Sequence, residues 1–106
     1  MDHFLSWTRG DYTVTTDNKK ISLDVVHDYL CNESYWAKNI PRDVVERSIE
    51  HSLCFGVFHH DAQIGYARVI TDRATIGYLG DVFILAPHRG EGHSRWLMDC
   101  IMSHPD

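Results

Sequence analysis

Apolar and polar residues alternate along four stretches of the chain, and this period of two predicts β-strands. The first is YTVTT at 12–16, which ends at the turn-forming residues DNKK. The other three are LCFGVFH, QIGYARVIT and IGYLGDVFIL, at 53–59, 63–71 and 76–85. Because short polar links, HDA and TDRAT, separate these three, we expect them to form an antiparallel meander.

Helical spacing of apolar residues marks three other segments. Ser22 is a suitable N-cap for a helix that ends near Cys31, and Pro41 suits the first position of a second helix that ends near His51. A third helix follows at 94–104. The apolar faces of the three are formed by Leu23, Val26 and Leu30; by Val44, Val45 and Ile49; and by Trp96, Leu97, Cys100 and Ile101. The predicted order is therefore strand, two helices, three strands and a helix, an α/β (α+β) fold with a mainly antiparallel sheet.

Composition limits the classes of protein and partner. The 106 residues are 43% hydrophobic and 24% charged, which is typical of a single compact domain over residues 1–106. A net charge of −5 disfavours a broad surface for nucleic acid or anionic lipid, and no apolar run is long enough to span a membrane. The three cysteines, Cys31, Cys54 and Cys100, form no disulfide framework, so a reducing cytoplasm is the expected location.

The segment PHRGEGHS at 87–94 stands where the last strand leads into the last helix. The first backbone N–H groups of a helix have no partner within it and carry partial positive charge. Gly90 and Gly92 would let a diphosphate approach this backbone, and Ser94 would offer a hydroxyl. A Gly-x-Gly turn also occurs as a simple tight connection, so the spacing alone leaves both interpretations open.

The longer segment DVFILAPHRGEGHSRWLMDCI resembles the acyl-CoA-binding motif of the GCN5-related N-acetyltransferases, with Arg89-x-x-Gly92-x-Ser94 at the strand–helix junction. The resemblance implies that acetyl-CoA is the cofactor and that an acetyl group is transferred to an amine. It implies that the backbone of Val82, Phe83 and Ile84 runs beside the pantetheine arm. It also implies that the pyrophosphate is held by Arg89, Gly90, Glu91, Gly92, His93 and Ser94.

The chain departs from the family pattern in two respects. At Glu91, His93 and Ser94, members often carry a basic or neutral residue, an aliphatic residue, and glycine or alanine; we expect Glu91 to face solvent and His93 to be packed. In addition, the later strands and helix of the family fold have no counterpart after the last helix. We therefore expect a domain truncated after this helix, with an exposed strand or helix that pairs with a second copy in a symmetric dimer.

Direct attack of an amine on a thioester needs a proton acceptor and a donor for the developing oxyanion. Asp81 is the first candidate for the base and Tyr78 a lesser one, although Asp81 also fits an ordinary strand-end carboxylate. A backbone N–H near Phe83 or Ile84 would serve the oxyanion. The alternative function is a non-catalytic domain that binds a CoA-type ligand weakly or associates with a partner chain.

Two polar segments remain. In the family, the link between the first two helices borders the acceptor, so Glu33, Tyr35 and Trp36 are predicted substrate contacts, although the two aromatic residues also fit a role in covering the core. His59 and His60 resemble metal ligands. We expect a solvated turn and no metal there, because adjacent histidines on a hairpin link should point to different sides.

Overall fold

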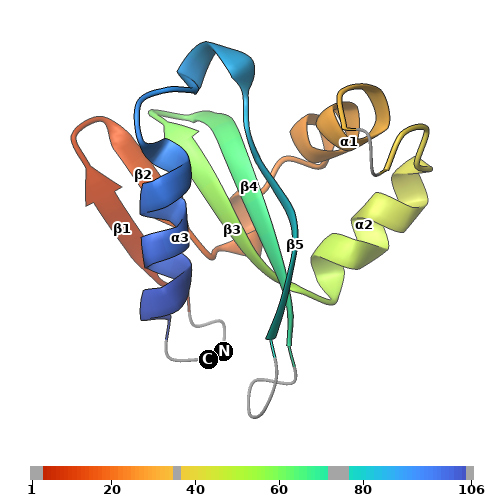
Figure 1. Cartoon of the computed structure of the whole chain (residues 1–106). Helices are drawn as coiled ribbons and strands as arrows, with labels where there is room; N and C mark the ends of the chain where they lie inside the picture. The colour runs from red at the N-terminus through yellow and green to blue at the C-terminus, as the bar shows by residue number, and fades with distance from the viewer. Residues whose placement is uncertain (1–3, 35–36, 72–76, 105–106) are drawn as a thin grey trace.

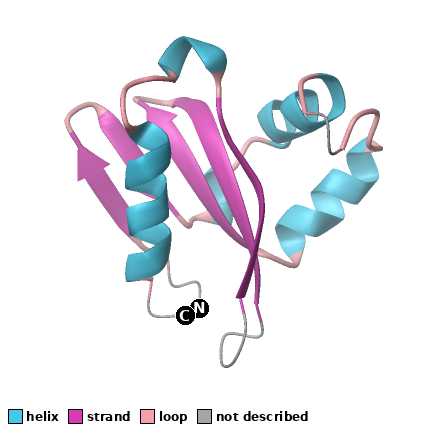
Figure 2. Ribbon diagram, in the orientation of Figure 1, coloured by secondary structure: helices cyan, strands magenta, loops and turns pink. Residues whose placement is uncertain are grey.

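The computed structural model describes residues 4–34, 37–71 and 77–104, which form a five-stranded antiparallel sheet with helices on both faces (Figures 1 and 2). The strands follow one another across the sheet in chain order. The strands are β1 (Ser6–Arg9), β2 (Tyr12–Thr15), β3 (Leu53–His59), β4 (Ala62–Thr71) and β5 (Gly77–Ile84). The helices of this part of the chain are α1 (Leu23–Asn32), α2 (Arg42–Glu50) and α3 (His93–Ser103), with short 3-10 turns η1 (Asn18–Lys20) and η2 (Ala86–His88).

The α+β class and the antiparallel meander are confirmed, and β1 is an addition that the pattern did not predict. This strand is short and mostly exposed, so it carries little alternation between apolar and polar residues. It forms a hairpin with β2 through a turn in which Gly10 has a φ of 60°. A second difference is small: Pro41 is the N-cap of α2 and lies one position before its first residue.

The sheet separates two hydrophobic clusters. Phe55 packs on the face covered by α3, and the adjacent Cys54 packs on the face covered by α1 and α2, as the period of a strand requires. Most of the buried residues on the α3 side are aliphatic, and Phe55 and Cys100 are buried with Val14, Val57, Ile64, Ile84 and Leu97. The other side includes hydroxyl and thiol groups, with Val26, Tyr29, Leu30, Val45, Tyr66 and Phe83 beside Cys54.

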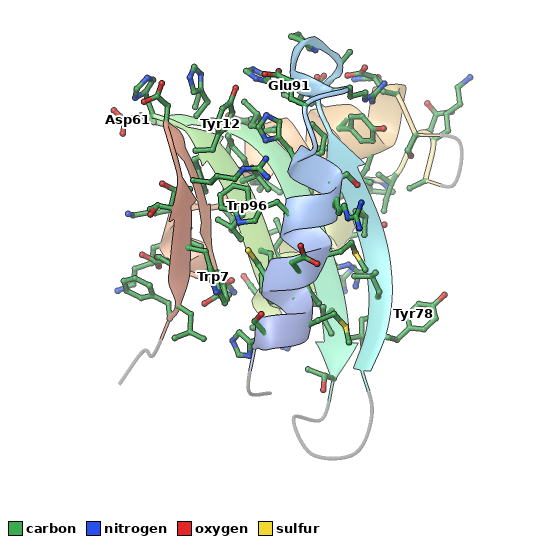
Figure 3. All side chains as sticks on the ribbon, turned by 60° about the vertical axis from the view of Figure 1, so that its left-hand side comes forward. Trp7, Tyr12, Asp61, Tyr78, Glu91 and Trp96 are labelled. Atoms are coloured by element: carbon green, nitrogen blue, oxygen red, sulfur yellow. The ribbon has the colours of Figure 1, made fainter. Side chains whose placement is uncertain are left out.

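The sheet ends at β5, whose first half is exposed. The side chains of Tyr78 and Leu79 are 67% and 37% exposed, and Tyr78 points away from the sheet in Figure 3. An edge strand with exposed apolar residues can pair with another chain. Pairing between two copies along this edge stays a prediction. Among the described helices, none has the length and apolar character needed to cross a membrane.

Candidate functional site at the end of strand β5

The junction between β5 and α3 leaves the start of the helix open. Gly92 is the N-cap of α3, with a φ of 81°, and no side chain caps the helix. The Trp96 N–H donates a backbone hydrogen bond to the Gly92 carbonyl at 3.1 Å. The preceding Gly90 also has a positive φ, 84°, and a Cβ at that position would meet no atom within 4 Å. Both glycines therefore adopt a conformation that other residues rarely adopt, and Gly90 lies next to open space.

Arg89 ties this junction to the rest of the site. Its Nε donates to the Ile84 carbonyl at 2.7 Å, and its Nη2 donates to the Tyr29 hydroxyl at 3.2 Å. The Tyr29 ring in turn stacks on Phe83, with centroids 4.0 Å apart. The last turns of α1 are thereby fixed to the end of β5. Tyr29 was not predicted as a site residue, although its spacing from Val26 and Leu30 places it on the apolar face of α1.

His93 is buried at the first position of α3, as expected. It is 4% exposed, its ring lies 4.1 Å from that of Tyr12, and its Nδ1 is 3.2 Å from Arg9 Nη2. Burial lowers the pKa of His93, with the nearby Glu91 carboxylate acting in the opposite direction. The Nε2 atom is buried without a hydrogen-bond partner. This atom is a polar group that the protein leaves unsatisfied beside the open start of the helix.

The charges around the junction are mixed. Arg9 from β1 stacks over the Trp96 ring at 4.8 Å and brings a guanidinium close to the first turn of α3. A Cβ at Gly92 would lie 4.0 Å from Arg9 Nη2. Glu91 is more than half exposed, and its Oε2 lies 4.0 Å from His93 Nε2. The uncapped helix start, the two glycines and Arg9 fit a diphosphate, provided that the Glu91 carboxylate stays toward solvent.

A bulge interrupts β5 just before this junction. Tyr66 of β4 faces Phe83 and Arg68 faces Gly80, so Asp81 and Val82 together oppose a single residue of β4. Asp81 has a φ of 50°, which is uncommon for a residue other than glycine. Because a bulge disrupts the ladder locally, it loosens the regular pairing of the β5 backbone at the position where the resemblance implies contact with a pantetheine arm.

The Asp81 carboxylate is held by Arg68. Arg68 Nε donates to Asp81 Oδ2 at 2.7 Å, and the two side chains are 19% and 12% exposed. Arg68 Nη1 also lies 3.4 Å from the Ser52 hydroxyl, next to the end of α2. Sequence reasoning identified the acid and missed its partner. The available signal was Arg68 itself, the one charged residue in the stretch QIGYARVIT.

Cys54 and Tyr66 lie behind this ion pair. Cys54 Sγ and the Tyr66 hydroxyl are 3.2 Å apart and fully enclosed. Burial raises the pKa of both groups. Both groups therefore stay protonated near neutral pH, and Cys54 is packed in the core.

The other predicted site residues are not gathered at the junction. Tyr78 is exposed three residues before Asp81, on the half of β5 away from α3. Glu33 is the exposed C-cap of α1, one turn after Tyr29. Tyr35 and Trp36 lie outside the described residues. Of the strand segment itself, Phe83 and Ile84 are buried and Val82 is partly buried, while Ser94 is exposed in the first turn of α3.

Comparison with known proteins identifies the fold and the family of the chain. A crystal structure from Xanthomonas campestris pv. campestris, titled provisionally as an acetyltransferase of the GNAT family, superposes with a TM-score of 0.85 and is 47% identical. The match covers 99% of this chain and 68% of that one. A Staphylococcus aureus protein, 24% identical with a TM-score of 0.69, shares the fold over 86% of this chain and 66% of its own. The fold is thus that of the acyl-CoA N-acyltransferases.

The family model for the acetyltransferase (GNAT) family matches residues 23–104. The chain therefore belongs to the GNAT family. A protein of Gibberella zeae, also named provisionally as an acetyltransferase, is 33% identical over a match that covers 91% of this chain and 65% of that protein. The chain thus spans about two thirds of the length of this relative.

Proposed function

We propose that the protein transfers an acetyl group from acetyl-CoA to a primary amine. The observation that carries the proposal is the uncapped, glycine-initiated start of α3 directly after the bulged strand β5. In the reaction, the bond from the acetyl carbon to sulfur breaks, a bond to the amine nitrogen forms, and the amine loses a proton while the thiol of CoA is released. Free cysteines are consistent with action in a reducing cytoplasm.

Each end of the donor would meet a different part of the site. The backbone of Gly90, Gly92 and the first turn of α3 would bind the pyrophosphate, with Arg9 as a nearby cation. The β5 backbone at Val82 to Ile84 would run beside the pantetheine arm, where the bulge loosens its pairing with β4. Acetyl-CoA supplies the activated thioester; the protein supplies position, hydrogen-bond donors and a route for the proton.

Asp81 is the proposed proton acceptor because it lies in the bulge, next to the segment that would hold the thioester. Its ion pair with Arg68 offers a second role, that of fixing the shape of the bulge. The two roles predict different behaviour. If Asp81 is the base, replacing it should lower turnover by more than the loss of stability explains. If the ion pair is purely structural, replacing either partner should lower stability and turnover by similar amounts.

The acceptor would enter from the side of α1. Glu33 is exposed one turn beyond Tyr29, whose ring and hydroxyl contact the end of β5 through Phe83 and Arg89. A carboxylate at this position would attract a cationic amine toward the site. Glu33, Tyr35 and Trp36 remain the proposed acceptor contacts.

The test is release of free CoA from acetyl-CoA in the presence of small primary amines: a diamine, an amino sugar and a short peptide with a free N-terminus. We expect release that depends on the amine. Binding of acetyl-CoA without amine-dependent release would favour the alternative, a non-catalytic domain that binds a CoA-type ligand.

The matched pair Asp81→Asn and Arg68→Met separates the roles of Asp81. If Asp81 accepts the proton, Asp81→Asn should lower kcat by about 100-fold with little change in the Michaelis constant for acetyl-CoA. Arg68→Met should keep more activity than Asp81→Asn, because it leaves the carboxylate that would accept the proton in place. Equal loss of stability and equal loss of kcat in both variants would make the pair structural.

A further inference from the structure

Two hairpin turns meet at the end of the sheet on the side of β1. Because β2 pairs with β3, the β1–β2 turn at Asp11 and the β3–β4 turn at His60 lie next to each other. The His60 N–H donates to the Asp11 carbonyl at 3.3 Å. Figure 3 shows Tyr12 and Asp61, which follow Asp11 and His60 in the chain, at this same end of the molecule. The backbone alone thus brings two hairpin tips together.

The adjacent histidines at this end lie side by side, so the expectation that they point apart is wrong. Their ring centroids are 4.6 Å apart. The reason is the backbone at His60, which has a φ of 56° and leaves the extended geometry that would alternate neighbouring side chains. A positive φ at a residue other than glycine is uncommon, although histidine adopts it more readily than most.

Three potential metal ligands converge here, one from the first hairpin and two from the second. A carboxylate oxygen of Asp11 and one ring nitrogen each of His59 and His60 all lie within 4.8 Å of one another. Donors bound to one tetrahedral zinc ion are about 3.3 Å apart, given bonds of about 2.0–2.1 Å. Asp11 and His60 are exposed, so small side-chain rotations would close this difference.

The third ligand is already oriented. The His59 ring stacks on Tyr12, with centroids 4.7 Å apart and planes 24° apart, which restricts its rotation. A fixed ligand lowers the entropic cost of assembling the site. Two imidazole nitrogens and a carboxylate oxygen are a set that Zn²⁺ accepts, with a fourth position left for water or another ligand.

We propose that Asp11, His59 and His60 bind a divalent zinc ion that joins the β1–β2 hairpin to the β3–β4 hairpin. The site is separate from the residues proposed to bind the acetyl donor and does not depend on the proposed reaction. It adjoins them through Tyr12, whose hydroxyl is 3.4 Å from His88 Nδ1 in the connection between β5 and α3. Zinc would hold β1, and with it Arg9, against the rest of the sheet.

Affinity for Zn²⁺ should be measured on untagged protein by competition with a chromophoric chelator. We expect one ion per chain, and a loss of at least about tenfold in affinity for His60→Asn and for Asp11→Asn, since each removes one of three ligands. Asparagine tolerates a positive φ, so His60→Asn preserves the turn. The matched control is His51→Asn, because His51 is an exposed histidine at the C-cap of α2. Its affinity should equal that of the parent.

Two further readouts locate the ion. Zinc should move the imidazole resonances of His59 and His60 and leave those of His27, which bonds to the Ile40 carbonyl, in place. It should also raise the melting temperature of the parent and not that of His60→Asn, because a ligand that binds only the folded state stabilises it. Absence of binding in the folded parent at millimolar Zn²⁺ would overturn the proposal. So would equal affinities in the parent, His60→Asn and Asp11→Asn, each shown to be folded by circular dichroism.

Discussion

Helices α1 and α3 both follow a strand of the same sheet, yet their first turns are satisfied in different ways. At α1, the Ser22 hydroxyl accepts from the Val25 N–H at 3.2 Å, and the Ser22 N–H donates to the Gln63 side chain at 2.7 Å. At α3, Gly92 occupies the same N-cap position, and no side chain caps the helix. One helix start is closed by the protein itself, and the other is left open.

The difference shows how a helix start becomes a candidate binding site. A glycine N-cap costs a helix only about a few tenths of a kcal/mol relative to serine, so α3 leaves its first N–H groups without a side-chain partner at little cost in stability. Two glycines with positive φ, the buried Nε2 of His93 and the nearby Arg9 guanidinium lie at the open end. The dipole of α3 can then act on an external anion, whereas that of α1 acts on its own cap.

Among the variants that test this difference, Gly92→Val is expected to have the largest effect on the affinity for CoA. A β-branched side chain at a φ of 81° disturbs the backbone that would bind the pyrophosphate, and affinity for CoA should fall by about 100-fold. Equilibrium dialysis with labelled CoA measures the loss, and circular dichroism checks that α3 persists. Unchanged affinity in the folded variant would remove the junction from the site.

A smaller loss is expected from Arg89→Met. This variant removes the hydrogen bonds to the Ile84 carbonyl and the Tyr29 hydroxyl that fix the junction against β5 and α1. Affinity for CoA should fall by about tenfold, the equivalent of about 1.4 kcal/mol. If the affinity for CoA measured by the same dialysis stays at the parent value, Arg89 does not set the shape of the proposed pyrophosphate site.

Ser22→Ala tests the helix start that is capped by a side chain, that of α1. Loss of the cap should lower the free energy of unfolding by about 1 kcal/mol and leave affinity for CoA unchanged. Urea denaturation gives the stability, and dialysis gives the affinity. A drop in affinity as large as that of Arg89→Met would show that the start of α1 also contributes to the site.

The smallest effect concerns the pH dependence of stability at the start of α3. Burial lowers the pKa of His93 in the folded state, so the unfolded chain takes up its proton first as the pH falls. The contribution of neutral His93 to stability is present above about pH 6.5 and declines below it, until the folded-state pKa is reached. His93→Leu should therefore lose less stability than the parent between pH 7.5 and pH 5.5 in urea denaturation. Parallel losses would assign the dependence to other groups.

The periodic parts of the fold were predictable from the sequence, and the parts set by backbone exceptions were not. The meander and the helix after Ser22 follow from alternation and capping, and the junction follows from its glycines. Strand β1 was missed because four mostly exposed residues carry little pattern. His59 and His60 lie side by side because His60 has a positive φ, and the residue types alone do not predict that φ.

Within the candidate site, the sequence identified the glycines and Asp81 and could not identify their tertiary partners. Arg68 lies 13 positions from Asp81 in the chain, and Arg89 lies 60 positions from Tyr29. These contacts depend on the sheet register and on the packing of α1 against β5. They can be identified only when the register of the strands is known.

The most direct test of the open helix start compares Gly90→Ala with Gly10→Ala. Both glycines have a positive φ, 84° and 60°, and a Cβ would meet no atom within 4 Å at either position. Backbone strain should therefore cost both variants similar stability, about 1 kcal/mol. Calorimetric titration with CoA should give parent affinity for Gly10→Ala and an affinity about tenfold weaker for Gly90→Ala, where the methyl group enters the proposed pyrophosphate site. Equal affinity in the two variants would contradict the assignment of this junction as the binding site.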